Sequence, residues 1–354
     1  MSPSRSLASL IAAVAAIGFA CSAPAFAHGS NDPDATALSF VAFGCNRVNP
    51  TDTTGDPSTA NVAELQRTLA DIAQLDPKPR YLFFIGDEVL GYTADTVRLA
   101  SELQAWRTLY EASPLPAAGV QLVAIPGNHE TQTDKKVAAA ANERTFLRVM
   151  APYIAHGGNG PTAGGPDGFT TDQSKLSYSF TDGTTHFIVM NTDPTGLDAH
   201  APTRWAQADI AAARAAGATH IFVFGHKPAY PYPTEPTDGL SINAAARDSF
   251  WTVLGQGGVD AMIAAHNHVY YRSQPTAAPT LQIIAGNGGS KLDSGLDPSM
   301  APTGEYYGFT QVAISNSGMV TYRSYGRDVP TAGYTASVAS ENTTVRDSVV
   351  VGSR

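Results

Sequence analysis

Cysteine is nearly absent from this sequence, because its 354 residues include only Cys21 and Cys45. Cys21 lies in an N-terminal segment that has the pattern of a secretory signal peptide, so the predicted mature chain keeps Cys45 alone. A single cysteine cannot form an internal disulfide, which excludes a fold stapled by disulfides. A lone thiol that is kept in an exported protein therefore calls for a functional explanation.

Clustered basic residues and long apolar runs are also missing. The formal net charge is -9, and no block of Lys and Arg occurs, which disfavours nucleic acid as a dedicated partner. Beyond the N-terminal segment, no apolar stretch is long enough to span a membrane. With 43% apolar and 15% charged residues, the composition fits one large globular domain with a sizeable core. The sequence indicates no particular oligomeric state.

The N-terminus has the pattern of an export signal. Arg5 supplies a positive start, residues 7–20 are apolar and rich in alanine, and Ala25-Phe26-Ala27 is a small-x-small cleavage site. The apolar stretch is short and close to the cleavage site, which disfavours a membrane span, and a lipoprotein signal is the weaker alternative. We therefore predict a signal peptide over residues 1–27 and a periplasmic or secreted product.

The rest of the chain reads as two α/β halves within one domain. We predict a disordered lead-in over residues 28–36, the domain over 37–327, and a C-terminal tail over 328–354 that adds one strand. The expected strands cover residues 37–43, 81–86, 120–125, 176–180, 186–191, 220–224, 259–264, 280–285, 308–314 and 319–325. The expected helices cover residues 59–75, 94–110, 137–150, 203–216 and 242–254. This order predicts two sheets with helices outside.

A segment rich in Gly, Pro and Thr, Pro152 to Asp172, separates the two halves. Two interpretations stay open for it. It is either a floppy connection or an ordered loop folded over the entrance of a site, because long ordered loops are often functional.

Four short blocks place possible metal ligands directly after apolar runs. They are Gly86-Asp87, Gly127-Asn128-His129-Glu130, Gly225-His226 and Ala265-His266-Asn267-His268. Ligands of open α/β sheets collect beyond the carboxyl ends of the strands, so one Asp, one Asn and four His are expected to converge. Carboxylate oxygen and imidazole nitrogen suit zinc, iron and manganese, and a shared carboxylate can bridge two ions.

The order of these blocks resembles that of the calcineurin-like metallophosphoesterase superfamily, over roughly residues 39–325. Residues 265–272, 284–289 and 307–309 look like the purple acid phosphatase branch. The resemblance implies an α/β fold with a four-layer α/β/β/α sandwich of two mixed β-sheets. It also implies hydrolysis of a small phosphate ester by metal-bound hydroxide at two divalent or trivalent ions, with Fe, Zn or Mn expected ahead of Ca or Mg.

The resemblance assigns roles to the ligand residues. It implies that Asp87 bridges both metals and that Asn128 binds the second metal through its amide oxygen. It gives His226 and His266 to the second metal and His268 to the first.

The same resemblance leaves His129 out of the ligand set. It implies that His129 lies beside the scissile bond and donates a proton or hydrogen bond to the leaving group. Glu130 is expected to orient a neighbour.

The first block departs from the family pattern. Cys45 stands where the family has a ligand Asp, and Leu90 stands where purple acid phosphatases have a ligand Tyr. Either Cys45 is a thiolate ligand of the first metal, as in the PhoD-like branch, or the first site has decayed and Cys45 is a buried apolar residue. Asn46, Tyr92 or water are the candidates for the missing ligand.

Arg47 follows Cys45 by two residues. It could contact a phosphate oxygen and offset its charge, or it could form a surface salt bridge. The purple-acid-like blocks favour a phosphomonoesterase, whereas Cys45 favours a phosphodiesterase. A non-catalytic protein that binds metal or a phosphorylated ligand at a decayed site is the alternative from another class.

Overall fold

The computed structural model describes residues 1, 32–52, 55–294, 303–330, 333–335 and 342–352. Except for Met1, the predicted signal peptide lies outside this range. The end of the predicted lead-in is ordered, because the backbone N–H of Asn316 donates to the carbonyl of Ala35 at 2.9 Å and Thr36 already belongs to a strand. The prediction of disorder over residues 28–36 is therefore wrong at its C-terminal end.

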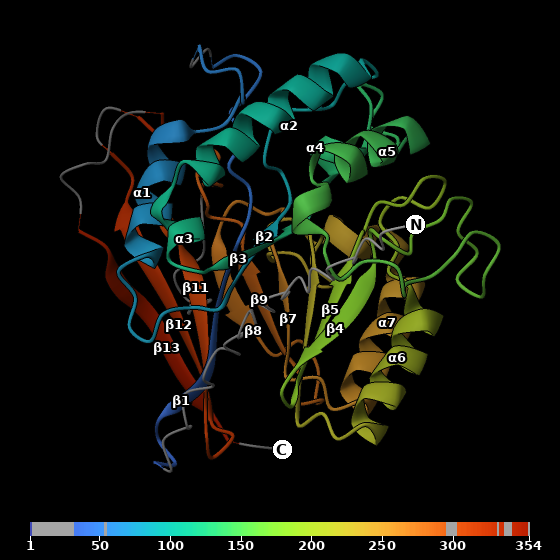
Figure 1. The fold of residues 1–354 in the computed structure, drawn as a ribbon, viewed down its shortest axis with the longest axis vertical. Helices are drawn as coiled ribbons and strands as arrows, with labels where there is room; N and C mark the ends of the chain where they lie inside the picture. The colour runs from blue at the N-terminus through green and yellow to red at the C-terminus, as the bar shows by residue number, and fades with distance from the viewer. Residues whose placement is uncertain (2–31, 53–54, 295–302, 331–332, 336–341, 353–354) are drawn as a thin grey trace.

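Two mixed sheets face each other in the middle of the molecule (Figure 1). The first has the order β13-β12-β11-β1-β2-β3. Its strands are β1 (Thr36–Phe43), β2 (Tyr81–Ile85), β3 (Gln121–Ile125), β11 (Tyr306–Ser315), β12 (Val320–Asp328) and β13 (Thr344–Val351). β1, β2 and β3 are parallel, and the other three pair antiparallel. The tail thus supplies the expected extra strand, at the edge of this sheet.

The second sheet has the order β10-β8-β9-β7-β6-β5-β4. Its strands are β4 (Tyr178–Asp182), β5 (Thr185–Met190), β6 (His220–Gly225), β7 (Ala261–Ala264), β8 (Tyr270–Ser273), β9 (Leu281–Ala285) and β10 (Thr303–Gly304). β5, β6, β7 and β9 are parallel, and β4 and β8 run antiparallel to their neighbours. The sequence did not predict β8 and β10, which pair with each other in antiparallel register.

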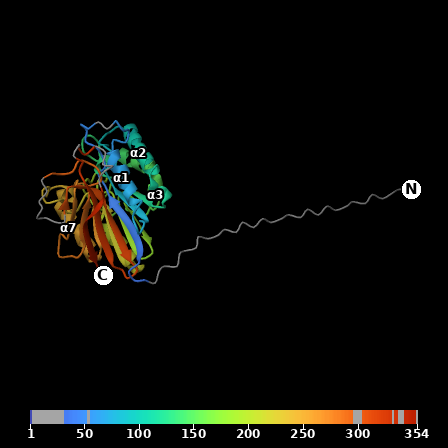
Figure 2. The same ribbon diagram turned by 90° about the vertical axis from the view of Figure 1, so that its left-hand side faces the viewer.

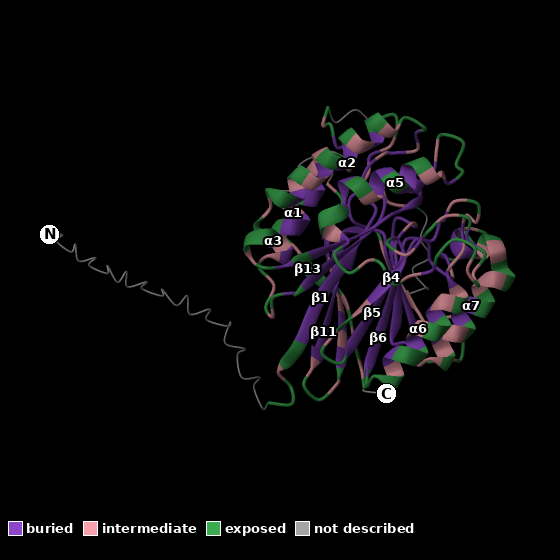
Figure 3. Ribbon diagram, turned by 45° about the vertical axis from the view of Figure 1, so that its right-hand side comes forward, coloured by how far each residue is buried: buried purple, intermediate pink, exposed green. Residues whose placement is uncertain are grey.

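Helices cover the outer face of each sheet. The helices are α1 (Val62–Ile72), α2 (Thr96–Glu111), α3 (Pro114–Ala117), α4 (Asn128–Thr131), α5 (Ala140–Val149), α6 (Thr203–Ala215) and α7 (Ala244–Gln256), with 3₁₀ turns at Ala151–Tyr153 and Gly239–Asn243. Figure 2 shows α1, α2 and α3 on the side of the first sheet, and Figure 3 shows α6 and α7 against the second. The predicted α/β/β/α sandwich is confirmed. None of the helices in the described residues is long and apolar enough to cross a bilayer.

An aromatic layer joins the two sheets. The ring of Phe83 on β2 stacks on that of Phe224 on β6, with centroids 3.8 Å apart. Phe40 on β1 meets Phe187 and Phe222 edge to face, at 5.3 and 5.0 Å. Each such pair contributes about 0.5–1.5 kcal/mol beyond burial of its area. This packing brings the carboxyl ends of β1 and β2 alongside that of β6.

The Gly- and Pro-rich segment between the halves is ordered in the described structure. Asp167 accepts hydrogen bonds from the backbone N–H groups of Arg204 and Trp205, at the start of α6. Other bonds run from Thr171 to Glu143 on α5 and from Asn159 to Ser179 on β4. The segment is therefore not a floppy connection, and these contacts attach it to the scaffold instead of to the predicted ligands.

A fully buried ion pair fastens β12 to α1. Both nitrogens Nη of Arg327 are used, Nη2 at 2.8 Å from Oε2 of Glu64 and Nη1 at 2.9 Å from Oδ2 of Asp71. The side chains of Arg327 and Glu64 have no exposed surface. Burial raises the pKa of Glu64, and Arg327 opposes that rise.

Arg327→Met is expected to lower the free energy of unfolding by about 3–5 kcal/mol, because it leaves the Glu64 carboxylate buried without its partner. Urea unfolding of the mature chain measures this. Arg80→Met is the matched control, since the Arg80 side chain is 55% exposed in its pair with Asp182 and should cost at most about 1 kcal/mol. Equal losses in the two variants would contradict the buried-pair argument.

Candidate metal centre

The carboxyl end of β2 delivers Asp87 to the site through Gly86. Gly86 has a φ of +77°, and a Cβ there would lie 2.5 Å from the backbone nitrogen of Gly127 and 2.7 Å from Nδ1 of His226. Only glycine therefore allows the loops after β2, β3 and β6 to approach this closely. A glycine therefore precedes Asp87 because a larger residue would clash with Gly127 and His226.

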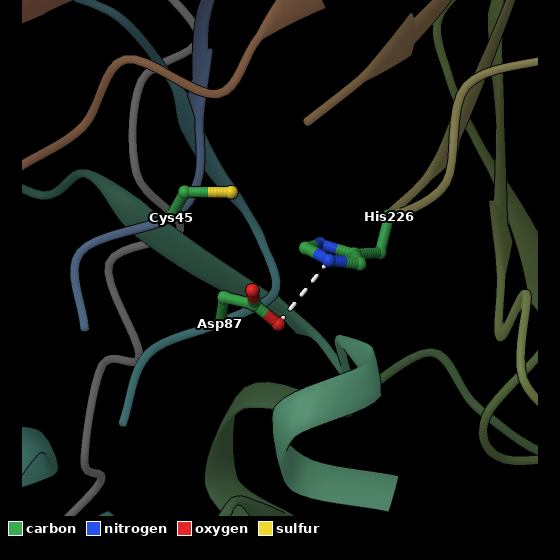
Figure 4. Close-up of side chains that lie close together, drawn as sticks. All are labelled: Cys45, Asp87 and His226. Carbon is green, nitrogen blue, oxygen red and sulfur yellow. Dashed lines mark ion pairs between the residues drawn. The ribbon is translucent and has the colours of Figure 1, made fainter. Parts of the chain in front are cut away.

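Three buried side chains from the ends of three strands form the first cluster. The thiol of Cys45 follows β1, the carboxylate of Asp87 follows β2, and the imidazole of His226 follows β6. One potential ligand atom from each lies within 4.8 Å of the other two. Figure 4 shows the three side chains around a common space, with Oδ1 of Asp87 at 3.2 Å from Nε2 of His226. The predicted residues Cys45, Asp87 and His226 are thus brought together.

Asn128 and His266 complete a second group around His226. Oδ1 of Asn128 lies 2.8 Å from Nε2 of His226 and 2.9 Å from Nδ1 of His266, and the two nitrogens are 3.2 Å apart. Metal bonds of about 2.0–2.2 Å at right angles would separate neighbouring ligand atoms by about 3 Å. The spacing therefore suits one shared cation.

The hydrogen bonds of the far ring nitrogens show which atoms face the centre. Nδ1 of His226 binds the carbonyl of Ile85 at 2.7 Å, and Nε2 of His266 binds a carboxylate oxygen of Asp238 at 3.1 Å. These partners only accept, so the far nitrogens carry the hydrogens and the near nitrogens present lone pairs. Tyr92 accepts a hydrogen bond from the amide nitrogen of Asn128, which turns Oδ1 of Asn128 inward. The donor set thus fits a metal ion.

The ring of His268 is also held through one nitrogen by a backbone carbonyl, but its ligand atoms lie outside the cluster of Cys45, Asp87 and His226. Its Nδ1 binds the carbonyl of Lys291 at 2.8 Å, which leaves Nε2 free, and its backbone N–H donates to Asp293 at 2.7 Å. Burial and the charge of Arg47 lower the pKa of His268 to about 3. His268 is not among the three residues whose ligand atoms cluster within 4.8 Å. Its role as a first-metal ligand stays a prediction.

The two side-chain candidates for the missing first-metal ligand differ in their contacts. The amide nitrogen of Asn46 donates to the carbonyls of Asn61 and Gly288, while its Oδ1 is buried without a hydrogen-bond partner among the described residues, so Asn46 stays a candidate. The Tyr92 hydroxyl contacts Asn128, on the side of the second group. Cys45, Asp87 and His226 are the described residues whose ligand atoms cluster within 4.8 Å, and the remaining first-metal ligand stays a prediction.

Glu130 orients its neighbours, as expected. Its Oε2 accepts hydrogen bonds from the backbone N–H groups of Asp87 and Gly127, at 2.9 and 2.8 Å, and its Oε1 accepts from Val89. This single carboxyl group ties the loop after β2 to the start of α4. Burial and the charge of Asp87 raise the pKa of Glu130 to about 7.

The two predicted catalytic side chains flank Asp87. Nε of Arg47 lies 3.7 Å from Oδ2 of Asp87, and Nε2 of His129 lies 3.8 Å from the same oxygen. Arg47 therefore pairs with the site carboxylate, which contradicts the surface salt bridge as its role. The His129 ring binds the carbonyl of Leu90 through Nδ1 and packs on the Tyr92 ring, with centroids 3.8 Å apart. Burial lowers the pKa of His129 to about 4, and the charge of Asp87 opposes that shift.

The protein's own charges and burial favour a carboxylate at Asp87 and a neutral thiol at Cys45. Burial would raise the pKa of Asp87, but the neighbouring His129, His226 and Arg47 together lower it below its ordinary value. Burial and the charge of Asp87 raise the pKa of the Cys45 thiol well above its ordinary value. A bound cation is therefore what would stabilise a Cys45 thiolate here.

A family model described as calcineurin-like phosphoesterase matches residues 51–270, which is more than half of the chain. The chain belongs to this family. The matched region begins after Cys45 and Arg47, so it leaves out the block that departs from the family pattern. A search among curated proteins found no match.

Solved structures share the fold at low sequence identity. A purple acid phosphatase from yellow lupin (Lupinus luteus) seeds is 15% identical with a TM-score of 0.56, over 89% of this chain and 53% of that one. A dimetal phosphatase from Danio rerio is 11% identical with a TM-score of 0.54, over 88% of this chain and 100% of that one. The chain thus spans about half the length of the lupin protein.

Sequence reasoning missed Asp238 and named Tyr92 only as a possible ligand. Asp238 lies in a Pro- and Thr-rich loop and belongs to no recognisable motif. Tyr92 was considered as a ligand, whereas its hydroxyl contacts Asn128. Spacing along the chain carries no signal for either contact, because both depend on residues distant in sequence.

Substitutions of Cys45 separate a ligand from a buried apolar residue. Cys45→Ser is expected to lower the metal content of the purified mature chain, and Cys45→Asp to retain metal with a shift toward a harder ion such as Mn(II). Elemental analysis of the variants measures both effects. If Cys45→Ala stays fully metallated and active while Cys45→Asp destabilises the fold, Cys45 is only a buried apolar side chain.

Proposed function

We propose that this chain is an exported metal-dependent phosphoesterase that hydrolyses small phosphate esters, with phosphomonoesters as the preferred class. The main support is that acceptor atoms of Asn128, His226 and His266 converge beside the shared carboxylate of Asp87. Family membership supports phosphate esters as substrates. The predicted signal peptide supports a periplasmic or secreted location.

The proposed ligand sets share Asp87. Asn128, His226 and His266 hold the second cation, and Cys45 and His268 hold the first. Fe, Zn or Mn suit this mixture of sulfur, nitrogen and oxygen better than Mg or Ca. When bound, the two cations supply Lewis-acid polarisation of the phosphoryl group and acidify water.

The chain's own side chains supply charge and a proton. Nε of Arg47 is buried and has no hydrogen-bond partner among the described residues, so it can donate to a phosphate oxygen beside Asp87. His129 is fixed through Nδ1 by the carbonyl of Leu90, which directs Nε2 toward the carboxylate side of the site. Nε2 carries a proton for the departing oxygen only in the imidazolium form, which the charge of Asp87 favours and burial opposes.

Hydrolysis of two chromogenic esters tests the function. The mature chain is expected to cleave nitrophenyl phosphate with a higher kcat/KM than bis(nitrophenyl) phosphate, and to carry two metal equivalents. Asp87→Ala should abolish turnover and lower the metal content without unfolding the chain. Wild-type rate and metal stoichiometry in Asp87→Ala would eliminate the dinuclear model.

The other outcomes of this assay identify the remaining candidates. Faster cleavage of the diester would favour the phosphodiesterase, for which the Cys45 thiol beside Asp87 is the supporting observation. Metal binding with no turnover of either ester would favour a protein that binds metal or a phosphorylated ligand without catalysis.

His129→Ala is expected to keep the metals and to lose roughly 10²–10⁴ in kcat, because it removes the donor to the leaving oxygen. The loss should shrink for esters whose leaving groups need no proton, such as nitrophenol. His156→Ala is the control, since that ring stacks on Phe180 and is not part of the centre. Loss of metal in His129→Ala would show that His129 is a ligand.

A further inference from the structure

One loop of the second half packs against the turn that carries His266 and His268. It is the segment Tyr232 to Asp238, which we call the covering loop. The backbone N–H of Tyr232 donates to Oδ1 of Asn267 at 3.0 Å. The amide nitrogen of Asn267 donates to Glu235 at 2.5 Å and to Oδ2 of Asp238 at 3.2 Å. Asn267 thus anchors the loop at both ends.

Asp238 also contacts His266, a predicted metal ligand. Its Oδ1 lies 3.1 Å from Nε2 of His266, while its Oδ2 binds Asn267. Because both oxygens are engaged, the carboxylate is fixed in orientation. Its side chain is 34% exposed, so a substitution there does not leave an empty space in the core.

His266 is the histidine that needs such support. Its φ is +69°, in the left-handed region that side chains disfavour, and its backbone N–H donates to Sγ of Cys45 at 3.2 Å. The rings of His226 and His268 are each fixed by a backbone carbonyl, from Ile85 and Lys291. The His266 ring depends instead on a carboxylate from a separate loop.

We propose that Asp238 is a positioning residue, which holds the His266 ring with Nδ1 toward Asn128 and His226 and thereby couples the covering loop to the second cation. The inference rests on the proposed dinuclear centre. A carboxylate on the far nitrogen fixes the tautomer and strengthens the near nitrogen as a ligand, and loss of such a partner typically costs 10–100-fold in metal affinity or activity.

Titration of the full mature chain with Zn(II), after removal of bound metal by a chelator, tests this role. In Asp238→Ala one equivalent, the one held by Asn128, His226 and His266, is expected to bind 10–100-fold more weakly, while the other is unchanged. Asp238→Asn keeps an oxygen acceptor for Nε2–H and should lie between Asp238→Ala and the wild type.

Glu235→Gln is the matched control. It removes a negative charge from the same loop, and its contact is the Asn267 amide and not an imidazole. It should therefore bind both equivalents like the wild type. An equal loss in Glu235→Gln and Asp238→Ala would make the effect one of loop charge and overturn the positioning role.

The remaining outcomes separate this inference from the proposed function. Two equivalents in the wild type and unchanged affinity in Asp238→Ala would overturn the role of Asp238 alone. Equal weakening of both equivalents, with a lower thermal midpoint, would show a general structural role and also overturn it. Fewer than two equivalents in the wild type would overturn the dinuclear centre and, with it, this inference.

Discussion

The structure depends on holding together acceptor atoms that repel one another. Oδ1 of Asn128 and the near nitrogens of His226 and His266 lie within 3.2 Å of one another, and none of the three carries a hydrogen in the assigned tautomers. A cation between them would turn this repulsion into binding. The surrounding fold must supply the rigidity that keeps these atoms in place.

Several residues of the centre have strained backbone conformations, which the surrounding packing must hold in place. Cys45, Asp87, Tyr92 and His266 all have positive φ values although none is glycine. Such residues cost of order 1–3 kcal/mol each and cluster at functional sites, where their surroundings over-determine them. Here the aromatic layer between the sheets and the backbone bonds of Glu130 provide that constraint.

The two halves of the chain contribute unequally to the centre. The first half gives Cys45, Asp87 and Asn128; Glu130 braces the loops of Asp87 and Asn128, and the backbone N–H of Cys45 donates to the carbonyl of Gly86. The second half gives the imidazoles, whose far nitrogens are held partly across the sheet interface, as where His226 binds Ile85. The centre therefore forms only when both sheets have packed.

The sequence by itself determined the strand-end blocks, the sandwich and the family. The blocks are local, because an apolar run followed by Gly-Asp or Gly-Asn-His-Glu carries its strand, its turn and its ligand within a few residues. The four-layer sandwich followed from the family resemblance that these blocks carry. The predicted lead-in was wrong at its end because its order comes from Asn316, far along the chain.

Only the tertiary structure decided what surrounds those ligands. Arg47 pairs with Asp87 and not with a surface acid, Tyr92 braces Asn128, and Asp238 reaches His266 from a loop without a motif. Each contact joins side chains brought together by the packing of separate loops. A linear pattern cannot encode it, since the distance between two loops is set by the sheets that carry them.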